Sequence, residues 1–87
     1  MREVQFVRME VLAPGTIIHA SGARRVEIWL EDSAMAAGVT INNVLAHSGS
    51  NVFEVPAGID AAILQDFKIV IPEGSRHRAF VTLTFLK

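Results

Sequence analysis

Hydrophobic and polar residues alternate along most of the chain with the period of two that is typical of β-strands. The clearest example is the segment 25–32, where Val26, Ile28 and Leu30 alternate with Trp29 and with charged residues. Such a strand packs one face on a core and turns the other to water, as strands of antiparallel sheets do. The same pattern, bounded by turn residues, predicts seven strands at residues 4–12, 16–20, 25–32, 39–46, 52–55, 67–71 and 79–86.

The connections between these strands are short and rich in glycine and proline. Residues 13–15 and 72–74 each end a strand with a sequence that favours a turn. No amphipathic helix separates the strands, which argues against a parallel α/β sheet, and residues 33–37 would form one short helical turn at most. We therefore expect an all-β fold, a small antiparallel β-sandwich or jelly-roll-like barrel of about seven short strands, with a single domain over residues 1–87.

Several large apolar side chains fall on strand faces opposite to the expected core. On the first strand, Val7, Met9 and Val11 are expected to face the core, which turns Phe6 toward water. Trp29 lies on the charged side of its own strand, where a bulge or a covering loop would be the alternative explanation. Aromatic residues are enriched in the cores of protein–protein interfaces. The pattern predicts an interface made of Phe6, Trp29, Val70, Phe80 and Leu86.

The final strand, residues 79–86, offers a second route to association. Val81, Leu83 and Phe85 would face the core, and the edge of the strand could pair with the sheet of a neighbouring subunit. The alternative is an internal strand that is paired on both sides.

Composition narrows the class of partner. Hydrophobic residues make up 51% of the chain and charged residues 20%, an apolar surplus that favours oligomerisation or docking on a larger partner. The formal net charge is −1, so nucleic acid is not an expected partner. The first residues carry charges and no apolar run approaches the length of a membrane span. We therefore expect cytoplasmic synthesis without a signal peptide and no membrane contact.

The residue types that carry catalysis or bind metals show no diagnostic spacing. The chain has no cysteine, which excludes thiol catalysis and thiolate metal sites. His19, His47 and His77 lie in separate segments, whereas metal sites often draw two histidines from one short motif. We expect no catalytic residues, no cofactor and no metal. A small-ligand- or metal-binding β-barrel that uses these three histidines is the alternative.

The sequence therefore favours a non-catalytic structural or assembly protein that acts through protein–protein contacts, either with itself or with a larger assembly. A second alternative is a small inhibitor that docks on one partner protein. In its general profile, a compact and cysteine-free β-domain, the chain is similar to the small cementing or decoration proteins of phage capsids. That resemblance implies a homo-oligomer bound to a virion.

Overall fold

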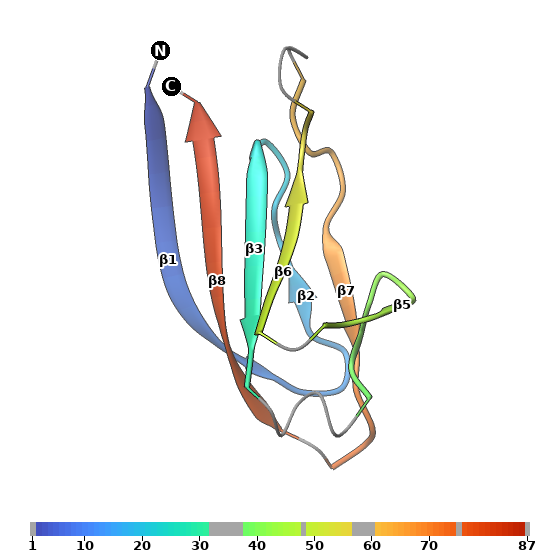
Figure 1. Ribbon diagram of the computed structural model, residues 1–87. Coiled ribbons are helices and arrows are strands. Elements are labelled where there is room, and N and C mark those ends of the chain that lie inside the picture. Colours follow the sequence, from blue (N-terminus) through green and yellow to red (C-terminus); the bar gives the residue numbers. More distant parts are fainter. Residues whose placement is uncertain (1, 32–37, 48, 57–60, 75, 87) are drawn as a thin grey trace.

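Two four-stranded antiparallel sheets make up the part of the chain that the computed structural model describes, residues 2–31, 38–47, 49–56, 61–74 and 76–86 (Figure 1). Sheet A has the order β1-β8-β3-β6 and contains Glu3–Leu12, His77–Leu86, Arg25–Leu30 and Gly49–Glu54. Sheet B has the order β2-β7-β4-β5 and contains Ile17–Ile18, Phe67–Val70, Thr40–Ile41 and Val44–Leu45. The predicted all-β sandwich is confirmed.

The strands pair like a single long hairpin that has been folded over on itself. β4 pairs with β5, β3 with β6, β2 with β7 and β1 with β8. In the sequence, the two strands of each pair therefore flank the pair named before it. Further pairing of β3 with β8 and of β4 with β7 joins these ribbons into the two sheets. An eight-stranded double sheet of this kind is a jelly roll.

The tip of this hairpin is a two-residue turn that the sequence analysis did not recognise. Residues 39–46 were expected to form one strand, but Asn42 and Asn43 adopt φ angles of 50° and 68° between β4 and β5. Two successive positive φ angles define a type I′ turn, and asparagine tolerates that conformation better than most residues. The Asn42 side-chain oxygen also accepts a hydrogen bond of 2.8 Å from the Lys68 amide, which ties the turn to β7.

The apolar faces of the two sheets pack against each other to form the core. Val26, Ile28 and Leu30 of β3 are buried, as the alternation predicted. Phe67 and Ile69 of β7 are buried opposite them. The Phe53 ring of β6 lies 4.8 Å from the Phe67 ring and so links sheet A to sheet B. Val81 and Leu83, which were predicted to face the core, are also buried, as is Ile71.

Strand β1 is turned the other way from the prediction. Register pairing places Met9 opposite Phe80 and Phe6 opposite Leu83, so Met9 lies on the outer face of sheet A and Phe6 on the inner face. Val7 and Val11 are exposed with Met9. Both faces of β1 carry apolar residues, so the alternation of residue types along the strand could not identify its core-facing side.

Strand β8 is an internal strand, which corrects the prediction that the final strand offers a free edge. It pairs with β1 on one side and with β3 on the other. Smaller differences concern strand ends: β6 begins at Gly49, within a predicted loop, and β2 is limited to Ile17–Ile18. The helical turn predicted at residues 33–37 lies outside the described residues.

The turn at the hairpin tip gives a direct test of the fold. Asn43→Val places a β-branched side chain at a φ of 68° and should lower the free energy of unfolding by about 1–2 kcal/mol. Asn43→Gly is the matched control and should cause no loss, because glycine adopts positive φ without strain. Urea unfolding measures both, and equal stability of the two variants would contradict the assigned turn.

Candidate interaction surface

The outer surface of sheet A carries a set of exposed apolar side chains, here called the apolar face. All four strands of the sheet contribute to it, and its members are between 40% and 67% exposed. The apolar face consists of Val7, Met9, Val11, Trp29, Val52 and Phe80. Antiparallel partners share a face of the sheet, so Met9, Phe80 and Trp29 are direct neighbours by register. The other three members lie around this row, with Val7 opposite Thr82, Val11 opposite Arg78 and Val52 opposite Glu27.

The centre of the apolar face is a row that crosses three strands. Met9 of β1 pairs with Phe80 of β8, which pairs with Trp29 of β3. The Trp29 and Phe80 ring centroids lie 5.8 Å apart at an interplanar angle of 54°. The two side chains remain 40% and 45% exposed. Large aromatic side chains that pack on each other and still face solvent are the usual anchors of a protein–protein contact.

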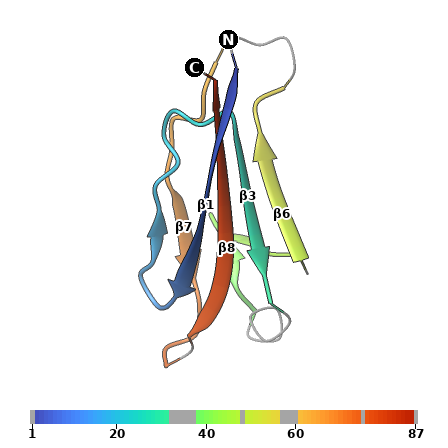
Figure 2. The same cartoon turned by 90° about the vertical axis from the view of Figure 1, so that its left-hand side faces the viewer.

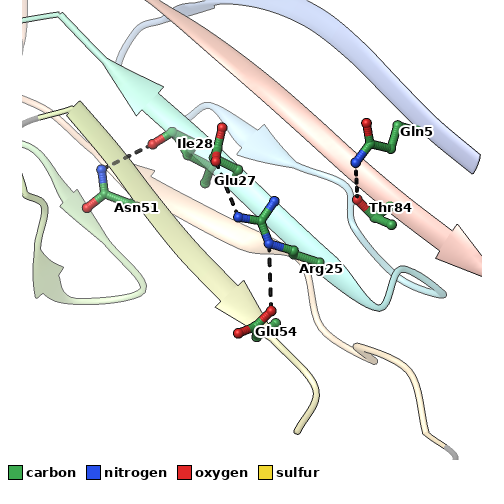
Figure 3. Close-up of polar contacts among 7 residues, drawn as sticks. All are labelled: Gln5, Arg25, Glu27, Ile28, Asn51, Glu54 and Thr84. Carbon is green, nitrogen blue, oxygen red and sulfur yellow. Dashed lines mark hydrogen bonds and ion pairs between the residues drawn. The ribbon is translucent and has the colours of Figure 1, made fainter. Parts of the chain in front are cut away.

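Paired polar side chains lie beside the Met9–Phe80–Trp29 row on the same sheet surface, here called the polar band (Figure 3). Arg25 Nη2 lies 3.4 Å from Glu27 Oε1, and Arg25 Nε lies 3.6 Å from Glu54 Oε2. In the same band, Gln5 Nε2 donates a hydrogen bond of 3.5 Å to Thr84 Oγ1. An apolar centre beside a paired polar band resembles the core and rim of an interface.

The five residues predicted as an interface do not form one surface. Trp29 and Phe80 are neighbours on the outer face of sheet A. Leu86 lies on that face too, but beyond the polar band, opposite Glu3. Phe6 lies on the inner face, where its ring packs edge-on against Phe85 at 5.8 Å. Val70 lies on the outer surface of sheet B, because its neighbour Ile69 faces the core.

Strand β1 forms an edge of sheet A, and nothing in the described chain pairs with its other side. Figure 2 looks at the molecule from this side, with β1 in front. The inner-face positions of β1 carry Arg8 and Glu10, whose Nε and Oε1 atoms lie 2.8 Å apart. Both side chains are partly exposed. Charged residues that point inward on an edge strand are a common guard against indiscriminate strand pairing.

The histidine alternative gains no support from the geometry. Among the described residues, no group of three or more His, Asp or Glu side chains could hold a metal ion. His19 Nδ1 instead lies 3.0 Å from Asp66 Oδ2. His47 lines a small apolar pocket between β5 and β6 with a volume of about 120 Å³. Ligand pockets usually measure roughly 300 Å³ or more.

Asn51, which also lines this pocket, is a buried polar residue that was not singled out from the sequence because it lies between the predicted strands 39–46 and 52–55. Its Nδ2 atom donates to the Ile28 and His47 carbonyl oxygens at 3.1 and 3.2 Å, and its Oδ1 atom accepts from the His47 amide at 2.7 Å. Asn51 therefore holds the β5–β6 connection against β3 (Figure 3). This network is structural, because each bond ends on the backbone.

Comparison of the chain with protein-family models, with curated proteins and with solved structures finds no match. In the described part of the chain, no helix has the length and apolar character needed to cross a bilayer.

The Asn51 network predicts a specific loss of stability. Asn51→Asp keeps the shape and the acceptor but removes both Nδ2 donors and buries a carboxylate, which should cost roughly 2–4 kcal/mol in urea unfolding. Gln65→Glu makes the same amide-to-carboxylate change at an exposed position and should alter stability by less than about 0.5 kcal/mol. Equal effects of the two substitutions would show that Asn51 does not hold the connection.

Proposed function

We propose that the chain is a non-catalytic assembly protein that forms homo-oligomers and buries its apolar face against other copies. The observation that carries the proposal is the Met9–Phe80–Trp29 row, an aligned and half-exposed apolar strip on the outside of a sheet whose inside already forms the core. A domain of this size needs only one apolar layer between its sheets to fold, so a second apolar layer has no role in the isolated monomer.

Physical chemistry favours burial of this strip. Each Å² of apolar surface removed from water contributes about 25 cal/mol, and clustered aromatic side chains contribute more than scattered ones. Trp29 and Phe80 already restrict each other by contact, so little rotamer freedom is lost when a partner covers them. The polar band around Arg25 would stay at the rim, where its ion pairs remain solvated.

A component of a larger protein shell fits this description, and a decoration or cement protein of a virion is the form that the sequence profile suggests. Jelly rolls occur in viral capsid and lectin domains as well as in cupins, so the fold is compatible with such a role without identifying it. The apolar face, and not the fold, is therefore the feature that favours assembly.

Phe80→Lys tests the apolar face, and Val70→Lys is its control. Both positions lie within strands and are 45% exposed, but Val70 lies on sheet B. A lysine at position 80 would meet apolar side chains in the assembly, so we expect the dissociation constant to rise about a hundredfold. Multi-angle light scattering over a range of concentrations should show smaller species for Phe80→Lys and the wild-type mass for Val70→Lys.

As a control, circular dichroism and thermal unfolding should first establish that both variants fold, and only then are their masses compared. A wild-type protein that stays monomeric at every concentration would refute homo-oligomeric assembly. A similar loss of mass in both variants would refute the assignment of the contact to the apolar face.

A further inference from the structure

We propose that two copies of the chain join edge to edge through β1, in antiparallel register about a two-fold axis that passes between the two Met9 residues. The two copies of sheet A would then form one continuous eight-stranded sheet. This inference rests on the proposed function and deepens it by naming one contact of the assembly, its partner and its register.

Strand β1 is well suited to pair with another strand. It is ten residues long and has exposed side chains on both of its faces, and within the described residues it pairs with β8 alone. Along its other edge, every second residue directs an amide and a carbonyl group away from the sheet. Long edge strands of this kind readily accept another strand, and a second copy of β1 is a strand of matching length.

The charges on β1 favour a particular partner strand and a particular register. A two-fold axis perpendicular to the sheet keeps inner faces next to inner faces, so Arg8 and Glu10 can meet only inner-face residues of the partner. With the axis at Met9, Arg8 lies directly opposite the partner's Glu10, and Glu10 opposite the partner's Arg8. Opposite charges in direct cross-strand pairs are favourable. These contacts would join the intramolecular Arg8–Glu10 pair of each copy into one network.

Registers centred on the residues next to Met9 bring less favourable side chains together. Centring the axis on Arg8 places two arginines opposite each other, and centring it on Glu10 does the same with two glutamates. Centring it on Val7 sets Arg8 opposite the partner's Phe6. Only the Met9 register pairs both charges with their opposites. Arg8 and Glu10 thus disfavour pairing with most strands and in most registers, but they favour pairing with a second copy of β1 in the register centred on Met9.

The same register extends the apolar face. On the outer surface, Met9 would lie next to the partner's Met9, and Val7 opposite the partner's Val11. The row Met9–Phe80–Trp29 would then continue across the axis into the same row of the second copy. An edge dimer therefore doubles the apolar face and leaves it open for contacts between dimers.

Cysteine cross-linking tests the register, because the natural chain has no cysteine. Directly opposed residues have Cα atoms about 4.5–5.5 Å apart, which suits a disulfide. Met9→Cys should therefore give a covalent dimer under mild oxidation. Val7→Cys should not, since its two copies would lie about 14 Å apart along the strands. A mixture of Val7→Cys and Val11→Cys should again cross-link, now between unlike chains.

Charge reversal tests the same contact on the opposite face of the sheet, away from the apolar face. Arg8→Glu alone and Glu10→Arg alone each place like charges across the axis, so each should raise the dissociation constant of the dimer about tenfold. An equimolar mixture of the two variants pairs every charge with its opposite and should form a heterodimer of wild-type affinity. An intrachain role for the pair would not produce this rescue, which native mass spectrometry can detect.

The outcomes separate this inference from the function it rests on. A protein that oligomerises by light scattering, but cross-links as well through Val7→Cys as through Met9→Cys and shows no rescue on mixing, would overturn the β1 dimer and leave assembly intact. A protein that is monomeric at every concentration would overturn both. Selective Met9→Cys cross-linking together with rescue would support both.

Discussion

The nested pairing of strands about the Asn42–Asn43 turn is the constraint on which the rest of the structure depends. Because the two halves of the chain run back along each other from this turn, β1 and β8 meet as the outermost pair, and their register decides which residues face out. That register aligns Met9 with Phe80, while the pairing of β8 with β3 adds Trp29 to the same row. The apolar face follows from topology as much as from composition.

The same topology also determines which edges are open. β8 is enclosed between β1 and β3 and has no free edge, whereas one side of β1 has no partner strand among the residues that the structure describes. Open edges and apolar faces are usually liabilities of a β protein. In this chain the open edge of β1 adjoins the apolar face, because Met9 belongs to both. The charges of Arg8 and Glu10 restrict how that edge can pair. Together they describe a surface suited to ordered association with itself.

Much of the fold could be predicted from the sequence, because apolar residues occupy alternate positions along β3, β7 and most of β8. The inner residues of β3, Val26, Ile28 and Leu30, were predicted and are buried. The face of β1 could not be predicted, since Phe6 and Met9 are both apolar and only the pairing with β8 distinguishes them. Trp29 and Phe80 were correctly placed on an outer face, but their contact depends on a register that alternation does not specify.

Amide hydrogen exchange of β1 at low and high protein concentration tests the central claim, that this strand and the apolar face beside it form a self-association surface. Edge amides of a monomer exchange quickly, and a partner strand protects them. We predict that alternate amides between Val7 and Val11 become protected as the concentration rises, while the open edge of β6 keeps its monomer rates. Exchange from β1 that is fast and independent of concentration, in a protein that is otherwise folded, would contradict the account.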